Sequence, residues 1–177
     1  LVMNANTAAR LNINTLGERV IATLQPEADE RRVALMHALD HEVPLAEFDP
    51  NQMTQAVLNL VKNALDAVEG EEDARVEIRT GLRDADFFVR VTDNGRGIPE
   101  DELKKVFEPY FTTKISGPGL RLAIVSRSVE EPGGRDDVFS QSGQGTAVTL
   151  LFPLESRPVR LIGNEPDDMR AYLSLGS

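Results

Sequence analysis

Asp93 is followed by two glycines at alternate positions, Gly95 and Gly97, in the segment Asp-Asn-Gly-Arg-Gly-Ile over residues 93–98. The preceding run, 87–92, is rich in apolar and β-branched residues and predicts a buried strand. A carboxylate at the end of such a strand can accept a hydrogen bond from an amine on a flat ligand, such as the exocyclic amine of adenine. The glycines would let backbone approach that ligand closely. Alone the pattern is weak, because glycine-rich turns after strands are common.

Three polar residues upstream, Asn59, Asn63 and Asp66, are spaced by four and then three positions. On a helix this spacing places their side chains near one face. An amide oxygen is a suitable hard ligand for Mg²⁺, which usually keeps water and takes substrate phosphates as its other ligands. The alternative is an ordinary amphipathic helix with asparagines on its wet edge, and the pattern alone leaves both open.

A third segment, residues 107–120, reads Phe-Glu-Pro-Tyr-Phe-Thr-Thr-Lys-Ile-Ser-Gly-Pro-Gly-Leu. Its aromatic residues can anchor a loop, and Gly117 and Gly119 lead to the predicted helix start at Leu120, where backbone N–H groups favour an anion. Lys114 can add positive charge that the acidic chain otherwise lacks. A surface loop with an apolar anchor is the alternative.

Composition narrows the function classes. The 177 residues include 29 acidic and 19 basic side chains, for a net charge of −10, which argues against nonspecific nucleic-acid binding. Cysteine is absent, which excludes disulfides, thiolate metal sites and a cysteine nucleophile. No run approaches the ~18 apolar residues of a membrane span, and no signal peptide is visible. We therefore expect no membrane contact by this chain and a cytoplasmic location.

The elements that must position these residues follow from hydrophobic periodicity and capping. Asp49 and Pro50 mark a helix start, and Pro26 marks a helix end. The pattern predicts helices over residues 1–10, 14–24, 50–69, 101–106 and 120–131, and strands over 33–36, 75–80, 87–92, 138–140 and 146–152. The expected fold is α+β, with a mixed sheet of about five strands and about three helices on one face.

Taken together, the segments and their order resemble the ATP-binding fold of the GHKL superfamily, specifically the catalytic domain of bacterial sensor histidine kinases. The asparagine box corresponds to residues 59–67, the first glycine box to 93–98, the phenylalanine box to 107–114, the second glycine box to 117–122 and the last glycine turn to 143–146. The wording of the phenylalanine box is closest to the nitrogen-regulation-like subgroup. The resemblance implies a two-layer α/β sandwich of the Bergerat type.

The resemblance also implies residue roles. It assigns a Mg²⁺ ion to Asn63, and it places Asn59 and Asp66 beside the nucleotide. The base pocket would be formed by Asp93, Gly95, Gly97, Ile98 and Thr146, and the phosphate lid by Lys114, Gly117, Gly119 and Leu120. Asn59, Asn63 and Lys114 are the candidate catalytic residues, and ATP and Mg²⁺ the expected cofactors.

Asn59 separates two branches of this superfamily. Gyrase-type ATPases have a glutamate at the corresponding position and use it as a general base on water. An amide cannot take a proton in that role. Asn59 therefore favours transfer of the ATP γ-phosphate to a protein histidine over hydrolysis.

The sequence departs from the family at the junction of the lid and the following helix. Arg121 stands where a glycine is usual and Pro118 where threonine is frequent. A side chain at position 121 would crowd the phosphates, although a guanidinium could instead bind one of them. The chain is expected to be a histidine kinase, either unaffected or impaired at this junction. A degenerate pseudokinase, which senses nucleotide or binds a partner without phosphotransfer, is the alternative.

Residues 1–13 are expected to be a remnant of a dimerisation helix or linker, 14–155 the catalytic domain, and 156–177 a tail. The tail resembles the opening strand of a receiver domain, with a plain polar tail as the alternative. His37 and His41 are the only histidines, and both fall in a predicted strand-to-loop stretch. We therefore expect the phosphate acceptor upstream of Leu1, on a dimerisation domain of a homodimeric sensor, with a response regulator as further partner. A membrane anchor in the upstream sequence is left open.

Overall fold

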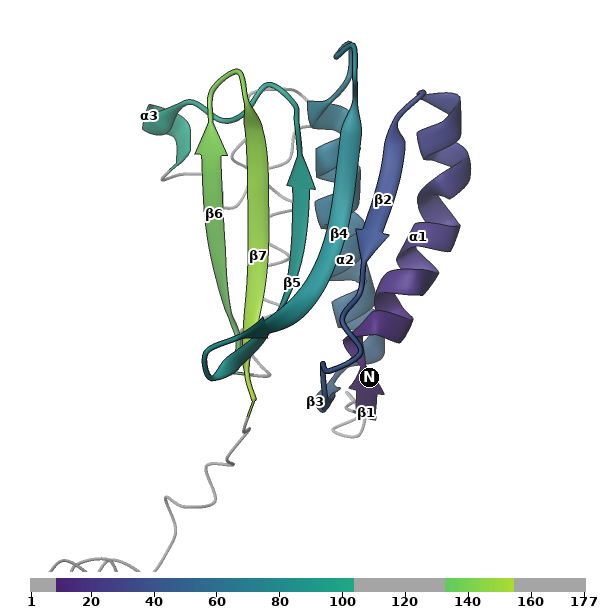
Figure 1. The fold of residues 1–177 in the computed structure, drawn as a ribbon, viewed down its shortest axis with the longest axis vertical. Helices are drawn as coiled ribbons and strands as arrows, with labels where there is room; N and C mark the ends of the chain where they lie inside the picture. The colour runs from purple at the N-terminus through teal and green to yellow at the C-terminus, as the bar shows by residue number, and fades with distance from the viewer. Residues whose placement is uncertain (1–8, 104–132, 155–177) are drawn as a thin grey trace, which may run out of the picture.

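The computed structural model describes residues 9–103 and 133–154 of the chain. The elements in chain order are β1 (Ala9–Asn12), α1 (Ile13–Glu30), β2 (Ala34–Ala38), β3 (Leu45–Phe48), α2 (Pro50–Ala67), β4 (Arg75–Arg83), β5 (Asp86–Asp93), α3 (Glu100–Leu103), β6 (Arg135–Gln141) and β7 (Gly145–Pro153). Figure 1 shows a sheet in front of two long helices.

Five strands form one mixed sheet in the order β2-β4-β5-β7-β6. β2 is parallel to β4, and the other neighbouring pairs are antiparallel. α1 and α2 pack on one face of this sheet, so the domain has two layers (Figure 1). The architecture confirms the predicted α+β fold, although the third long helix predicted over 120–131 lies outside the described residues.

The core lies between the sheet and the two helices. Alternate residues of the central strands, such as Val76 and Ile78 in β4 and Val91 in β5, are almost fully buried. The helices contribute Val20 and Leu60 among others to the same core. Successive side chains of a strand point to opposite faces. Every second residue of β5 and β7, including Asp93 and Thr146, therefore points toward the helical layer.

The start of α2 agrees with the prediction. Asp49 is the N-cap, and its carboxylate accepts hydrogen bonds from the backbone N–H groups of Asn51 at 2.9 Å and Gln52 at 3.3 Å. Pro50 occupies the first turn, where its missing N–H has no helical partner to lose.

Two predictions about the N-terminal region were wrong. Pro26 does not end its helix, because α1 continues to Glu30 with Pro26 on the exposed side and Ala28 fully buried. Burial beyond the proline outweighs the loss of one backbone hydrogen bond. Ala9 and Arg10, predicted as helical, belong to β1, which pairs antiparallel with the unpredicted strand β3. Such short strands carry little periodicity of their own, and each is stabilised by a partner distant in sequence.

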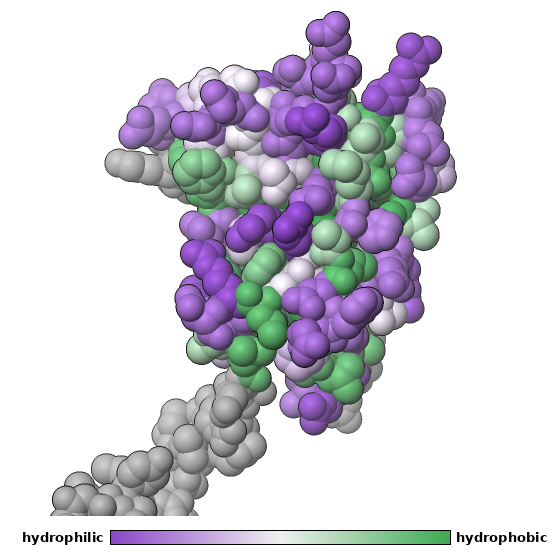
Figure 2. All heavy atoms as spheres, viewed as in Figure 1, coloured by the Kyte–Doolittle hydropathy of each residue, from purple (hydrophilic) through white to green (hydrophobic). Residues whose placement is uncertain are grey.

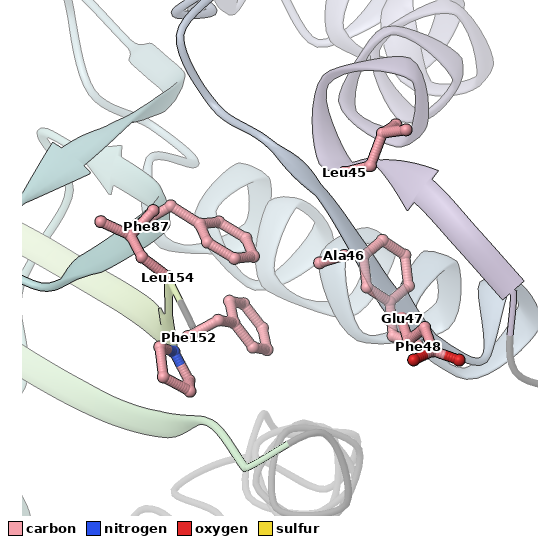
Figure 3. Close-up of a pocket in the computed structure, with 8 residues that line it drawn as sticks. Leu45, Ala46, Glu47, Phe48, Phe87, Phe152 and Leu154 are labelled. Carbon is pink, nitrogen blue, oxygen red and sulfur yellow. The ribbon is translucent and has the colours of Figure 1, made fainter. Parts of the chain in front are cut away.

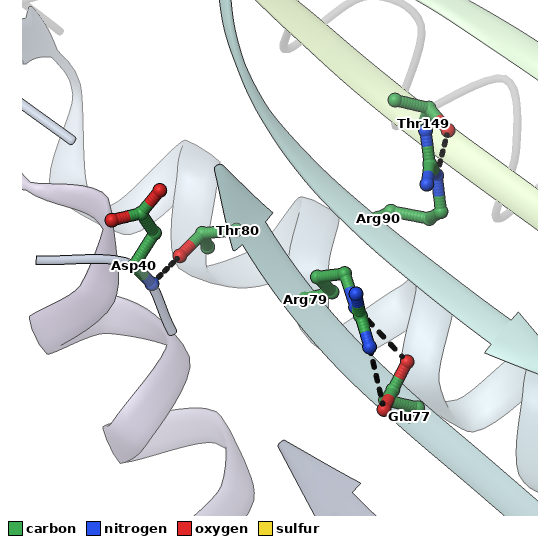
Figure 4. A network of polar contacts seen from close by, with 6 residues as sticks. All are labelled: Asp40, Glu77, Arg79, Thr80, Arg90 and Thr149. Carbon is green, nitrogen blue, oxygen red and sulfur yellow. Dashed lines mark hydrogen bonds and ion pairs between the residues drawn. The ribbon is translucent and has the colours of Figure 1, made fainter. Parts of the chain in front are cut away.

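Polar contacts tie the loops to this frame (Figure 4). The backbone N–H of Asp40 donates to Thr80 Oγ1 at 2.9 Å, and that hydroxyl donates to Asn14 Oδ1 at 2.6 Å. On the outer face of the sheet, Arg90 Nε donates to Thr149 Oγ1 at 3.0 Å. The guanidinium of Arg90 also lies 4.7 Å from the centre of the Phe88 ring.

The outer face of the sheet mixes polar and apolar residues (Figure 2). Phe139 and Met36, in its two edge strands β6 and β2, are exposed there. Across the described ranges, no helix combines the length and the apolar character needed to cross a membrane.

Candidate functional site

Three segments that are distant in sequence meet at one end of the sheet: the C-terminal end of α2, the loop after β5, and the β6–β7 hairpin (Figure 1). The backbone N–H of Arg96 in the loop donates to the carbonyl of Ala67 at 3.2 Å. The carbonyl of Arg96 accepts from the N–H of Gly143 in the hairpin at 2.7 Å. The glycine segment thus lies between the asparagine-bearing helix and the hairpin.

The glycines of this region are required by backbone packing within the protein. A Cβ at Gly95 would lie within 3.0 Å of the carbonyl of Ala67. A Cβ at Gly97 would lie equally close to the carbonyl of Gln141, and Gly97 also has a φ of +73°. These glycines were predicted to allow the close approach of a ligand. The structure adds a second reason, because a side chain at either position would push the loop off α2 or off the hairpin.

Asp93 is the last residue of β5, and its side chain is buried, with the residue 8% exposed. Its Oδ1 accepts a hydrogen bond from the backbone N–H of Gly95 at 2.9 Å, and the carboxylate also accepts from the N–H of Thr146. Burial raises the pKa of Asp93 to about 6, against the opposing effect of these two N–H groups and of the charge on Arg96. Asp93 is therefore an acceptor held in a poorly hydrated place, where a hydrogen bond to an amine is strengthened.

Thr146, the partner of Asp93 in the β5–β7 register, is also 8% exposed. Its hydroxyl lies 2.8 Å from Ser140 Oγ on the adjacent strand. Ser140 Oγ accepts in turn from the backbone N–H of Ile98 at 2.7 Å. The structure thus brings together the residues predicted for the base pocket, and the sequence analysis missed the one residue, Ser140, that links Ile98 to Thr146.

Asn59 and Asn63 lie one turn apart on α2. Asn59 is buried, and its Oδ1 accepts from Gln55 Nε2 at 3.1 Å. Asn63 is half-buried. Burial of an amide in a helix is unfavourable unless its hydrogen bonds are met, so Asn59 is more than a wet-edge residue of an amphipathic helix.

Asp66 has structural contacts that the sequence analysis did not foresee. Its Oδ1 pairs with Arg31 Nη1 at 2.9 Å, which joins the ends of α1 and α2. Its backbone carbonyl accepts from Arg96 Nη1 at 3.3 Å. Asp66 therefore helps to hold α1, α2 and the glycine loop together.

Asn94 is a second residue that the sequence analysis overlooked. Its Oδ1 accepts from the N–H of Arg75 and its Nδ2 donates to the carbonyl of Asp73, both at 2.7 Å. These bonds fasten the start of the glycine loop to the turn before β4. An asparagine before a glycine is a common turn signal in sequence, but its partners could not be read there.

The predicted phosphate lid belongs to a part of the chain that the structure does not describe. Lys114, Gly117, Gly119 and Leu120 lie outside the described residues, as do Pro118 and Arg121. Their roles stay predictions. His37 lies in β2 and His41 in the turn after it, both exposed, in the strand-to-loop setting that was predicted.

A small pocket of about 30 Å³ lies at the other end of the sheet (Figure 3). It lies between β3 and the aromatic pair Phe87 and Phe152, whose ring centres are 5.2 Å apart. Phe87 is near the start of β5, whereas Asp93 ends that strand. This pocket is therefore separate from the candidate site.

Comparison with known proteins agrees with the motifs. The family described as histidine kinase-, DNA gyrase B- and HSP90-like ATPase matches residues 48–156. Sensor histidine kinase ZraS of Escherichia coli K12 is 36% identical over 144 residues, which are 81% of this chain and 30% of ZraS. A putative sensor histidine kinase, NtrY-like, of Rickettsia conorii is 38% identical over 123 residues, which are 68% of this chain and 20% of that protein. The chain thus spans less than a third of the length of these two relatives.

The fold has a solved counterpart of similar size. The catalytic domain of histidine kinase ThkA matches with a TM-score of 0.73 and 28% identity, over 82% of this chain and 97% of the ThkA domain. The predicted resemblance is confirmed by both kinds of comparison: the chain belongs to the family of histidine kinase-, DNA gyrase B- and HSP90-like ATPases, and its relatives there are sensor histidine kinases.

Proposed function

We propose that this chain is the ATP-binding catalytic domain of a sensor histidine kinase, and that it transfers the γ-phosphate of ATP to a histidine on a dimerisation domain. The observation that carries the proposal is the buried carboxylate of Asp93, which faces Thr146 beside a tightly packed glycine loop. Membership of the family makes adenine the fitting ligand for that acceptor. A homodimeric protein, a response regulator as partner and a cytoplasmic location belong to the same proposal.

On the base side of the site, Asp93 accepts the hydrogen bond of the exocyclic amine of adenine, with Thr146 beside it. Gly95, Gly97 and Ile98 shape the pocket. Support comes from the backbone contacts that press the glycine loop against α2 and the hairpin, because they pre-organise the carboxylate before the ligand arrives.

On the phosphate side, Asn59, Asn63 and Asp66 of α2 face the nucleotide, and Lys114, Gly117, Gly119 and Leu120 close over its phosphates. Asn63 would hold a Mg²⁺ ion, and such an ion would supply positive charge next to the phosphate oxygens. The residues fit such an ion because Mg²⁺ needs few ligands from the protein. Within residues 9–103 and 133–154 no group of three or more His, Cys, Asp or Glu side chains gathers. An amide oxygen, waters and the phosphates themselves suit Mg²⁺, which seldom uses an all-protein cage.

Asn59 distinguishes transfer from hydrolysis. It lies on α2 with its oxygen bonded to Gln55, and an amide has no basic site with which to activate water. We therefore expect slow release of free phosphate from ATP. Robust hydrolysis that is abolished by Asn59→Ala would contradict this assignment.

Two measurements test the proposal. Mg-ATP should raise the melting temperature of the chain, because a ligand that binds only the folded state stabilises it by about 2.7 kcal/mol at a hundred times its Kd. Labelled ATP should then phosphorylate a supplied acceptor-helix protein. A melting-temperature shift without any transfer would favour the pseudokinase alternative. The absence of both would contradict nucleotide binding, and with it both the kinase and the nucleotide-sensing pseudokinase.

A further inference from the structure

Ser140 lies where three parts of the candidate site meet. It is half-buried in β6, directly opposite Thr146 of β7. Three polar groups surround its hydroxyl: the N–H of Ile98 at 2.7 Å, the carbonyl of Gly145 at 3.1 Å, and the hydroxyl of Thr146 at 2.8 Å. They belong to the glycine loop, the hairpin turn and the predicted base pocket.

The number of available protons assigns the direction of these bonds. A serine hydroxyl donates one hydrogen bond and accepts two. The N–H of Ile98 can only donate, and the carbonyl of Gly145 can only accept. All three contacts are satisfied together in one arrangement alone, in which Ser140 donates to Gly145 and Thr146 donates to Ser140.

This arrangement decides what Thr146 offers to a ligand. Once its proton points at Ser140, the Thr146 hydroxyl has only acceptor lone pairs left. The carboxylate of Asp93, its neighbour across the strands, is also an acceptor when ionised. The two side chains therefore present acceptors alone, so the site suits a purine that donates through an exocyclic amine and disfavours one with a carbonyl at that position.

We propose that Ser140 is a positioning residue that sets nucleobase specificity by fixing the hydroxyl of Thr146 as an acceptor. The inference rests on the proposed function, since it requires a purine nucleotide beside Asp93 and Thr146. Without the Ser140 hydroxyl, the proton of Thr146 is free to turn toward the ligand and can donate to a carbonyl. The loss of Ser140 should therefore relax the choice between bases rather than only weaken binding.

The test compares Mg-ATP with Mg-inosine triphosphate, which has a carbonyl in place of the amine of adenine. Affinities are measured by calorimetric titration of the 177-residue chain and of Ser140→Ala, after thermal unfolding has shown that both fold. We expect the parent to prefer ATP, and the ratio of the two affinities to fall by about tenfold in Ser140→Ala, the effect of one mismatched buried hydrogen bond.

Two further variants serve as controls. Ser140→Thr keeps the hydroxyl and should keep the parent ratio. Ser142→Ala removes an exposed hydroxyl from the same hairpin and should leave the ratio unchanged. Should Ser140→Ala fail to fold, Ser140→Cys has a similar shape but only a weak donor and acceptor, and should show the same relaxed ratio.

The outcomes separate the two proposals. An equal loss of affinity for both nucleotides in Ser140→Ala would make Ser140 a purely structural residue and would overturn the inference while leaving the proposed function intact. A parent chain that binds neither nucleotide would overturn both. A lower ratio of ATP affinity to inosine triphosphate affinity in Ser140→Ala, together with the parent ratio in Ser140→Thr, would establish the positioning role.

Discussion

Ionisation of Asp93 should lower the stability of the ligand-free folded chain. The residue is 8% exposed, and burial raises its pKa from 3.8 to about 6. The folded chain therefore holds the Asp93 proton more tightly than the unfolded chain does. At about 1.4 kcal/mol for each unit, this difference corresponds to about 3 kcal/mol of stability that is present below pH 3.8 and lost as the pH rises through about 6.

Asp93→Asn removes the charge and keeps an oxygen that can accept from the N–H of Gly95. At pH 7.5 the ligand-free variant should gain stability relative to the parent, by up to about 3 kcal/mol. The new amide NH₂ must find a partner, and its cost lowers the net gain. That cost is the same at every pH. The informative quantity is therefore the change in the stability difference between pH 4 and pH 7.5, which should favour the variant at the higher pH.

The assay is urea unfolding of both proteins at a series of pH values, analysed with a common m-value. Nucleotide titration of the same samples should show that the variant, although more stable, has a lower affinity for Mg-ATP. The variant should bind Mg-ATP about tenfold to a hundredfold more weakly at pH 7.5, because it lacks a charge-assisted bond to the adenine amine. The reasoning is refuted if the stability difference does not move toward the variant between pH 4 and pH 7.5.

Substitutions at four other positions test further parts of the proposed site. Asn94→Ala should destabilise the chain by about 1–2 kcal/mol in urea unfolding, since it removes two side-chain bonds of 2.7 Å, and Asn94→Asp, which keeps only the acceptor, should fall between it and the parent. Gly95→Ala should cost at least about 1–3 kcal/mol and weaken ATP binding, because its Cβ would overlap the carbonyl of Ala67. Gly143→Ala, which meets open space at a φ of +81°, should lose only about 1–2 kcal/mol of stability and keep ATP binding; equal ATP binding by both glycine variants would contradict the packing argument. Arg121→Gly should bind ATP more tightly than the parent in calorimetric titration if the side chain crowds the phosphates, and equal affinities would remove that explanation.

The local features of the fold could be predicted because their causes are local. Asp49 and Pro50 predict the start of α2, because Asp49 caps the helix and Pro50 has a fixed φ. The alternation of apolar residues in 75–80 and 87–92 predicts β4 and β5. The comparisons confirm the family to which the order of the motifs pointed.

The sequence by itself determined that a carboxylate, Asp93, ends a buried strand before two glycines, and that asparagines share a face of the preceding helix. Tertiary structure decided the rest. It extended α1 beyond Pro26, paired β1 with β3, bonded Asn94 to the turn before β4 and placed Ser140 between Ile98 and Thr146. It also buried Asp93 deeply enough to raise its pKa to about 6. Periodicity reports which face of an element a side chain occupies, whereas hydrogen-bond partners and loss of solvent depend on segments that meet only when the chain is folded.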